Sequence, residues 1–349
     1  MNLKETDCLW EHLSRTDKPI VLYGMGDGAD KMLGEFARRG IHAAGVFASD
    51  EFCRGQKFRG FEVLNYADAQ QRFGEMLVLV AFGTRLETVI NRIKKIAQEQ
   101  ELYVPDVPVC GGDVFDDAYY KAHAAEFKSV YEMLEDELSR NTFCNMIDYK
   151  LSGKPKYLFE CESDISSAYS DVLRLGAEES YVDVGAYTGD TIREFISECG
   201  GYKKIFAIEP DKKNFARLAA AVQALKNVEC CNMAAQERAG EVAFAQRGGR
   251  NSAVGKGENM IPATALDELI GDERVTYIKY DVEGEELSAL SGTRRIIMQQ
   301  KPKLLVSAYH RNDDLYSIPI LVHNMNPHYK IYLRHFPYVP AWDTNYYFV

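Results

Sequence analysis

The sequence predicts an α/β protein with two open sheets, a smaller one in its N-terminal part and a doubly wound one in its C-terminal part. The stretches 19–39 and 181–196 each show a buried strand, a glycine-rich turn and an amphipathic helical pattern. Strand-like apolar runs alternate with helical patterns after both turns, which is typical of βαβ units. At 349 residues the chain is also too long for one ordinary domain, so we expect two.

The second glycine turn carries the strongest signal of a binding site. It follows the predicted strand Tyr181–Val184, and Thr188 or Asp190 could cap the helix after it. Its two glycines let the backbone approach a ligand, and ligands of open α/β sheets lie at the carboxyl ends of strands. An ordinary turn that needs glycine only for its geometry is the alternative. If the turn binds a ligand, the contacts come from Asp183, Gly185, Ala186, Tyr187, Thr188 and Gly189.

The next strand adds an acid at a suitable distance. Lys204–Pro210 is a buried-strand run that ends in Glu209 followed by Pro210, about 20 residues beyond the turn. A carboxylate at this place can accept hydrogen bonds from both ribose hydroxyls of an adenosine. The turn and the acid together therefore favour an adenosine-containing ligand, with Glu209 and Pro210 beside it.

Four segments of the C-terminal half resemble the FkbM family of S-adenosylmethionine-dependent methyltransferases. They are YVDVGAYTGD at 181–190, AIEPD at 207–211, TALDEL at 264–269 and YIKYDVEGEELSALSG at 277–292. The resemblance covers the chain from about residue 155 to its end. It implies S-adenosylmethionine as cofactor, methyl transfer to a hydroxyl of a sugar, glycan or related small molecule, and a class I methyltransferase sheet of seven strands with the last one antiparallel.

Composition limits the alternatives. Hydrophobic residues make up 46% of the chain and charged residues 27%, as in soluble globular proteins. The longest apolar run, Met76–Phe82, is too short to span a membrane, and we expect a cytoplasmic protein without a signal peptide. A net charge of −11 disfavours a nucleic-acid partner. The eight cysteines form no C-x-x-C pair, so they predict neither a zinc site nor disulfides.

The first glycine turn has two interpretations. Gly24, Gly26 and Ala29 fit the pattern G-x-G-x-x-A, and Asp50 stands near the position of a ribose-binding acid. The turn could bind a dinucleotide or a nucleotide-sugar, or it could belong to a degenerate Rossmann-like module that packs on the catalytic domain. This half also resembles, more loosely, the nucleotide-sugar-binding domain of some sugar acyltransferases.

Between the two halves the pattern is helical. One stripe of a helix carries Phe127, Val130, Tyr131, Leu134 and Leu138, and acidic residues occupy the other faces. The expected divisions are a Rossmann-like domain over 1–112, a helical connector over 113–154 and a methyltransferase domain over 155–349.

The candidate catalytic groups follow the fourth and fifth strands of the C-terminal sheet. Asp281 and Glu283 come after one strand and His310 after the next, so all three should meet at the same sheet edge as the glycine turn. A carboxylate or imidazole there could take the proton of the acceptor hydroxyl, and Asp281 could also contact the cofactor. Alternatively the two acids only cap the following helix. The same three residues could also bind a metal, but nothing in the sequence favours one, and which of them is the base stays open.

Other contacts are predicted from position. Ala235 and Gln236, with Ala234, follow the third strand and would line the adenine. Arg250, Asn251 and Ser252 lie in a polar loop at 246–257 that could meet the substrate. Asp267 is expected to support a helix start.

Two other function classes remain open at this point. One is an NAD(P)-dependent oxidoreductase that uses Gly24, Gly26 and Asp50. The other is a non-catalytic nucleotide-sugar-binding protein. The identity of the acceptor, the N-terminal ligand and the oligomeric state are not determined by the sequence.

Overall fold

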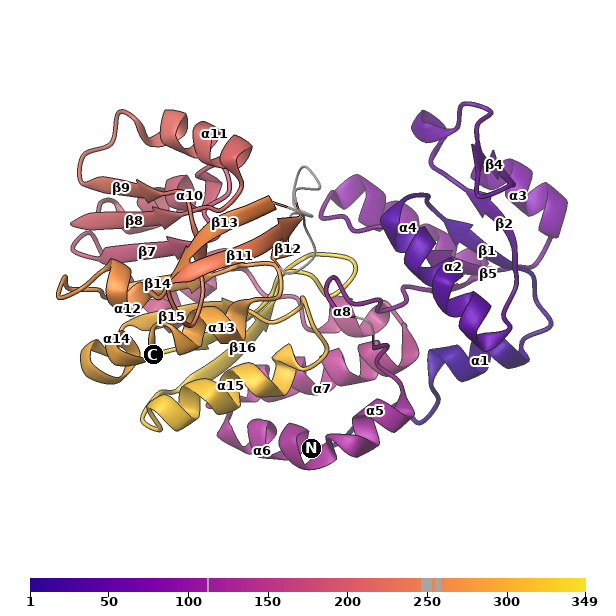
Figure 1. The fold of residues 1–349 in the computed structure, drawn as a ribbon. Coiled ribbons are helices and arrows are strands. Elements are labelled where there is room, and N and C mark those ends of the chain that lie inside the picture. The colour runs from indigo at the N-terminus through magenta and orange to yellow at the C-terminus, as the bar shows by residue number, and fades with distance from the viewer. Residues whose placement is uncertain (112, 246–252, 255–258) are drawn as a thin grey trace.

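The computed structural model describes residues 1–111, 113–245, 253–254 and 259–349. Figure 1 shows two α/β units side by side, the N-terminal one in indigo and violet and the C-terminal one in rose to yellow, with magenta helices running beneath both. In the part of the chain so described, no helix is both long and apolar enough to cross a membrane.

The N-terminal unit is a six-stranded sheet in the order β3-β4-β2-β1-β5-β6, with helices on both sides. All neighbouring strands are parallel except β3 and β4, so the order reverses direction between β1 and β5 as in a doubly wound sheet. Its elements are α1 (Leu9–Arg15), β1 (Ile20–Tyr23), α2 (Asp27–Arg39), β2 (Ala43–Phe47), η1 (Asp50–Phe52), β3 (Lys57–Phe58), β4 (Phe61–Leu64), α3 (Tyr66–Phe73), β5 (Leu77–Val80), α4 (Glu87–Glu99) and β6 (Glu101–Tyr103).

The C-terminal unit is a seven-stranded sheet in the order β16-β17-β15-β14-β7-β8-β9. Only β17 runs antiparallel to its neighbours, which confirms the predicted methyltransferase-like sheet. Its strands are β7 (Ser180–Val184), β8 (Lys204–Ile208), β9 (Val228–Cys231), β14 (Tyr277–Tyr280), β15 (Lys303–Ser307), β16 (Ile331–His335) and β17 (Thr344–Phe348). Its helices are α10 (Asp190–Cys199), α11 (Lys212–Val222), α12 (Leu266–Leu269), α13 (Glu286–Ser291), α14 (Arg294–Gln300) and α15 (Asp314–Met325).

Both faces of this sheet are covered, because successive side chains of a strand point to opposite faces. Tyr181 and Tyr277 stack on one face at 4.9 Å between ring centroids and pack against Phe195 of α10. Val182 and Ile278, on the other face, belong to a core that includes apolar residues of α14 and α15. The strands are therefore near-continuous apolar runs, as expected of a parallel sheet buried on both faces.

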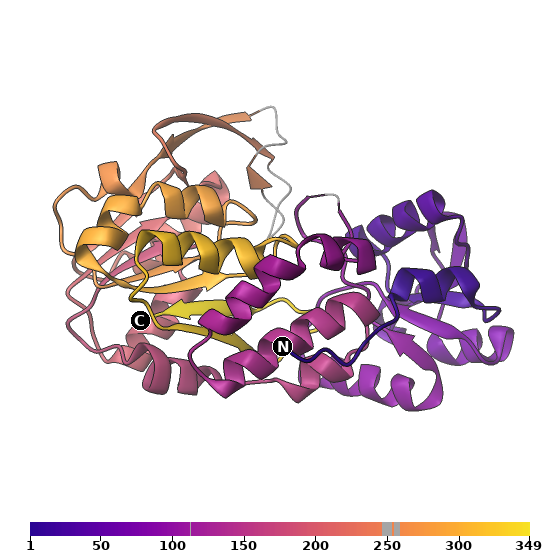
Figure 2. The same cartoon turned by 90° about the horizontal axis from the view of Figure 1, so that it is seen from below.

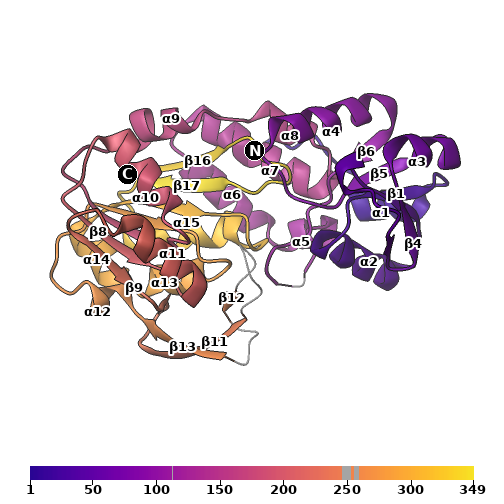
Figure 3. The same cartoon turned by 90° about the horizontal axis from the view of Figure 1, so that it is seen from above.

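A small second sheet is inserted before β14. It has the order β10-β13-β11-β12, from β10 (Ala234–Ala235), β11 (Gly240–Ala245), β12 (Ala253–Val254) and β13 (Asn259–Thr264). Figure 3 shows β11 and β13 standing out from the main C-terminal sheet.

The predicted connector packs on the C-terminal unit. It contains α5 (Asp117–Ala122), α6 (Ala124–Met133) and α7 (Glu137–Ser152), followed by α8 (Lys156–Glu160), α9 (Ile165–Ser167) and the π-helical turn η2 (Ala168–Leu173). Of its apolar stripe, Phe127, Val130 and Leu134 are buried and Leu138 is exposed. The first residues of the chain cross this layer, since the carboxylate of Asp148 in α7 accepts the N–H groups of Lys4 and Glu5 (Figure 2).

The two units meet through loops at the carboxyl ends of their sheets. Thr84, after β5, exchanges two backbone hydrogen bonds with Val339, at 2.7 and 2.9 Å. A side chain at Gly83 would place its Cβ 2.2 Å from the Trp342 ring, so only glycine lets the two loops pack this closely. The N-terminal unit is thus held against the edge of the methyltransferase sheet where a ligand of an α/β protein is expected.

We expect the α7 N-terminus to depend on one partly buried ion pair, between Asp136 and Arg334. Asp136 caps α7 by accepting the Ser139 N–H at 2.7 Å, and Arg334 Nη2 of β16 lies 2.6 Å from its other oxygen. Asp136→Ala removes the cap and leaves the buried Arg334 charge without this partner, and should lower the free energy of unfolding by about 2–4 kcal/mol in urea denaturation. Glu137→Ala is the control, because that side chain is 74% exposed, and should change it by less than about 0.5 kcal/mol. Equal effects of the two variants would contradict this role.

Candidate functional site

A cavity of about 290 Å³ lies at the carboxyl edge of the C-terminal sheet. Several predicted site residues line it together: Gly185, Tyr187, Glu209, Pro210, Ala235, Gln236, Asp281 and Glu283. The N-terminal unit also contributes, through Arg85 after β5 and Val109 after β6. The cavity is therefore built from both units.

The glycine turn is compressed between two neighbouring strands. Gly185 has a φ of +89°, and a Cβ there would lie 1.9 Å from the carbonyl oxygen of Asp281 at the end of β14. The backbone N–H groups of Gly185 and Ala186 both donate to the carbonyl of Ile208 at the end of β8, each at 3.0 Å. The sequence predicted that the glycines let the backbone of this turn approach another group closely. In the structure that group is the backbone at the ends of β14 and β8.

Glu209 lies at the end of β8 beside this turn. One oxygen of its carboxylate accepts the Tyr187 N–H at 2.9 Å and the other accepts the Asp211 N–H at 2.8 Å. Burial raises the pKa of Glu209 to about 7, although these hydrogen bonds oppose the shift. Each carboxylate oxygen retains a lone pair for a further donor.

Other residues of the turn support it from behind. Asp183 is fully buried and accepts a hydrogen bond from the Thr191 hydroxyl. Ala186 is also fully buried, and Asp183, Ala186, Thr188 and Gly189 are not among the residues that line the cavity. The expected capping of α10 by Thr188 or Asp190 is wrong, because Gly189, at a φ of +81°, is the N-cap and no side chain caps the helix. Glycine enters this left-handed conformation without the cost that a side chain would add.

Asp281 projects from the end of β14 into the cavity. It accepts the Tyr309 hydroxyl at 3.0 Å, and Lys279 Nζ lies 3.6 Å from its other oxygen. Burial would raise the pKa of Asp281, but the charges of Lys279 and His310 and the Tyr309 hydrogen bond outweigh it and lower the pKa. Asp281 is therefore an ionised carboxylate in the cavity wall.

His310 lies behind Asp281 and is 1% exposed. Its Nδ1 is 2.9 Å from Glu286 Oε1, and its Nε2 is 3.6 Å from Asp281 and 3.7 Å from Glu283. Burial favours the neutral ring, but these three carboxylates outweigh it and raise the pKa of His310 to about 10. The strand before it, β15, ends at Ser307, so His310 stands in the following turn and does not line the cavity.

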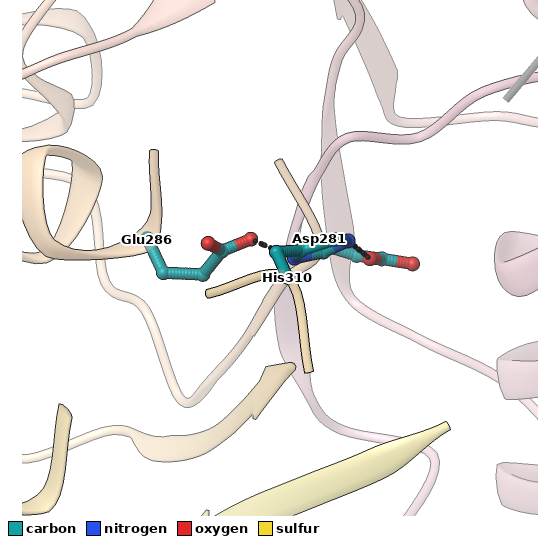
Figure 4. A group of neighbouring side chains, drawn as sticks. All are labelled: Asp281, Glu286 and His310. Carbon is teal, nitrogen blue, oxygen red and sulfur yellow. Dashed lines mark ion pairs between the residues drawn. The ribbon is translucent and has the colours of Figure 1, made fainter. Parts of the chain in front are cut away.

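Asp281, Glu286 and His310 offer ligand atoms within 4.8 Å of one another, which is close enough for a metal ion. Figure 4 shows that Glu286 and Asp281 lie on opposite sides of the imidazole, each beside a different ring nitrogen. Because one ion binds only one nitrogen of an imidazole, this arrangement is better described as an imidazolium held between carboxylates.

The remaining predictions are placed as follows. Ala235 lies in β10, with Gln236 directly after it, and both face the cavity. Gln236 Nε2 donates to Glu285 at 3.2 Å. Arg250, Asn251 and Ser252 lie outside the described residues. Asp267 accepts the N–H groups of Arg295 and Ile296 at the start of α14, which agrees with its predicted supporting role.

The cavity also contains residues that the sequence did not assign to a binding site. Lys279 and Asp190, the latter expected only as a helix cap, line it near the turn, and Arg85, Tyr338, Trp342 and Asp343 line the end next to the N-terminal unit. Lys279 is the third residue of the buried four-residue strand YIKY. A single lysine within a buried strand is unusual, so its position could have marked it as a candidate site residue. The residues at the other end come from distant loops, and no local pattern connects them.

The N-terminal glycine turn packs closely against neighbouring residues at Gly24 and Gly28, whereas Gly26 has open space beside it. A Cβ at Gly24 would lie 2.5 Å from the Phe82 ring, and one at Gly28 would lie 2.3 Å from the carbonyl oxygen of Ala81. Lys31 of α2 reaches across to the carbonyls of Pro108 and Val109, at 3.1 Å each. Asp50 begins η1 and is exposed. A nucleotide at this turn stays a prediction.

Comparison with known proteins gives one family and one extensive structural match. Residues 183–337 match the family model of the methyltransferase FkbM domain. A solved methyltransferase FkbM from Methylobacillus flagellatus KT has a TM-score of 0.76 and 23% identity, over 97% of this chain and 92% of that one. Its fold therefore matches both units. No curated protein sequence matches the chain significantly.

Two further solved structures match only about half of the chain. An rRNA methylase from Streptococcus thermophilus covers 56% of this chain and 95% of its own, at 13% identity and a TM-score of 0.36. Fibrillarin from Aeropyrum pernix, solved with S-adenosyl-L-methionine, matches 50% of this chain and 67% of its own length, at 13% identity and a TM-score of 0.33. At these scores neither supports an inference about this chain.

The strand order and the cavity at the carboxyl edge agree with the fold of methyltransferases. More particularly, residues 183–337 of the C-terminal unit match the methyltransferase FkbM domain, as the four sequence segments predicted.

We expect Gly185→Ala to disrupt the site because its Cβ would overlap the Asp281 carbonyl. Gly200→Ala is the matched control, since Gly200 has a similar φ of +72° but no atom within 4 Å of its Cβ position. The control should cost about 1–2 kcal/mol of unfolding free energy for the left-handed backbone alone. Gly185→Ala should cost at least about 2 kcal/mol more, because the strand ends must separate. Equal losses in urea denaturation would show that the close approach is unimportant.

Proposed function

We propose that this protein transfers a methyl group from S-adenosylmethionine to a hydroxyl of a sugar, glycan or related small molecule. One observation carries the proposal: the Gly185 turn, Glu209, an ionised Asp281 and a group of aromatic rings all line a single cavity. Both reactants can therefore meet in one enclosed space.

At the cofactor end, the residues fit an adenosyl compound. The Glu209 carboxylate can accept the ribose hydroxyls, and Ala235 and Gln236 lie where the adenine would be, beyond β8. When bound, S-adenosylmethionine supplies a methyl group activated by a positive sulfonium. The acidic groups at the cavity, Asp281 among them, favour a cation.

At the acceptor end, the cavity is lined by Tyr169, Phe336, Tyr338 and Trp342. The Tyr338 and Trp342 rings lie 5.5 Å apart between centroids at an angle of 43°. Carbohydrate rings have apolar C–H faces and polar edges, so aromatic side chains with a few polar groups suit them. Arg85 and Asp343 supply such polar groups.

We assign the proton transfer to Asp281. With S-adenosylmethionine bound, the cofactor would supply the methyl group to the acceptor oxygen and leave as the thioether, and the Asp281 carboxylate would accept the hydroxyl proton. His310 is buried, and its two ring nitrogens lie beside Asp281 and Glu286. It is therefore suited to holding these two carboxylates in place. Most of the rate gain should come from alignment of the acceptor oxygen with the methyl group and sulfur.

Cofactor affinity should depend on pH through Glu209. Because ribose hydroxyls donate to the ionised carboxylate, and its pKa is about 7, affinity should be full above pH 7 and fall below it, by up to about tenfold per pH unit. We expect calorimetry with S-adenosylhomocysteine to show this slope between pH 7 and 5.5. In Glu209→Gln the slope should disappear, because the amide does not titrate in this range. A slope of the same size in the variant would assign it to another group.

Methyl transfer itself is tested with labelled donor and a panel of hydroxylated carbohydrates. The wild-type protein should label at least one of them. With that acceptor, Asp281→Asn should lower the rate by about 10²- to 10⁴-fold and leave S-adenosylhomocysteine affinity within about threefold. Asp272→Asn is the matched control, because that side chain is fully exposed. Tight donor binding without transfer to any acceptor would indicate a non-catalytic binding protein.

A further inference from the structure

Arg85 belongs to the N-terminal unit but lines the cavity of the C-terminal unit. The residue before it, Thr84, exchanges two backbone hydrogen bonds with Val339, and Gly83 packs against the Trp342 ring. On its other side the helix α4 begins shortly after it. The backbone of Arg85 is therefore held in place by the C-terminal unit, while its side chain is exposed.

The same contacts place Arg85 beside the aromatic rings proposed to hold the acceptor. Tyr338 directly precedes Val339, to which the Arg85 loop is bonded, and Trp342 is the ring that covers Gly83. Arg85 and both rings line the cavity. A sugar ring lying on these aromatic side chains would therefore have the guanidinium as a neighbour.

The charge of Arg85 has no partner in the wall. Of the described residues that line the cavity, Lys279 and Arg85 carry a positive charge. Lys279 Nζ is buried at 3.6 Å from both Asp183 and Asp281, so its charge is compensated inside the wall. In contrast, the Arg85 guanidinium makes neither a hydrogen bond nor an ion pair with any residue that the structure describes. Arg85 is therefore the cation that is available to a ligand.

Asp343 is the carboxyl group on which Arg85 has an electrostatic effect, without an ion pair between them. Burial raises the pKa of Asp343, against the lowering effects of a hydrogen bond from Asn345 and of the charges of Lys279 and Arg85. The Asn345 amide donates to Asp343 Oδ1 at 2.8 Å, so this carboxyl group is engaged elsewhere. It is also influenced by Asp281, which indicates that Arg85 and the proposed base belong to the same electrostatic neighbourhood.

A free guanidinium in this position favours a negatively charged acceptor. Its planar fork of N–H groups matches the two oxygens of a carboxylate or phosphate. A neutral acceptor that covered Arg85 would remove water from the charge and leave it without a partner, which is costly. Both effects separate acidic from neutral acceptors in the same direction.

We propose that Arg85 selects an acceptor that carries an anionic group, a carboxylate or a phosphate, on the sugar that the aromatic rings hold. Arg85 is then a specificity-determining residue that the N-terminal unit supplies to the methyltransferase cavity. This inference rests on the proposed function, because it narrows the class of acceptor for the same cavity.

The test uses sets of sugars that differ only in the group on the sixth carbon. Each set contains a hexose, its hexuronic acid and its hexose 6-phosphate, in the gluco, galacto and manno series. With labelled S-adenosylmethionine, the wild-type protein should favour an acidic form over the neutral hexose by about 10- to 100-fold in kcat/KM, mainly through KM, which is the range of one charge-assisted hydrogen bond. The better of the two acidic forms identifies the anion as carboxylate or phosphate.

Arg85→Gln should reduce this preference to within about threefold. Arg85→Lys should restore part of it, because lysine keeps the charge but not the planar fork. Arg217→Gln is the matched control, since Arg217 is exposed on α11 and does not line the cavity, and should keep the full preference. The affinity for S-adenosylhomocysteine, measured by calorimetry, should be unchanged in every variant and reports that the cofactor site is folded.

Equal kcat/KM for acidic and neutral forms in the wild-type protein would overturn the assignment of Arg85 while methyl transfer stands. A preference that persists in Arg85→Gln would do the same. Calorimetry on protein saturated with S-adenosylhomocysteine gives a second measurement without turnover, in which a hexose that binds as tightly as its acidic counterparts also contradicts the assignment. If no member of the panel is bound or methylated, the proposed function itself is rejected.

Discussion

The site depends on the close approach of two strand ends. The backbone at Gly185 passes so near the Asp281 carbonyl that no side chain fits between them. This contact places the turn after β7, the acid after β8 and the acid after β14 on one short edge. The groups assigned to the ribose and to proton transfer lie on this edge, and Ala235 and Gln236 join it from the small inserted sheet.

The same edge concentrates charge. Carboxylates from several elements converge around Lys279 and His310, which are both buried. Inside a protein, such cations are tolerated only when carboxylates surround them, and the carboxylates are ionised only because the cations are there. Lys279 is among the residues that line the cavity, although its ammonium is buried, whereas His310 does not line it.

The N-terminal unit contributes to the same cavity. Its β5 loop is tied to Val339 by two backbone hydrogen bonds, and Gly83 lies against Trp342. Arg85 therefore sits at a defined place in the cavity wall. The unit's clearest contribution in this structure is therefore to the wall of the cavity in the C-terminal unit. The solved FkbM methyltransferase from Methylobacillus flagellatus shares the fold over nearly the whole of both chains.

The sequence alone predicted the fold class from buried runs and glycine turns, and the family resemblance predicted a seven-stranded C-terminal sheet with its last strand antiparallel. The glycine turn and the acid at the end of the next strand also pointed to the sheet edge where the cavity lies. The tertiary structure decided the rest. It turned His310 into the wall, put Asp183 behind Lys279, and brought Arg85 and Trp342 to the cavity from loops far apart in the chain. Local periodicity predicts which residues end a strand. Which of their side chains reaches the cavity depends on packing between strands that are far apart in the sequence and meet only in the folded chain.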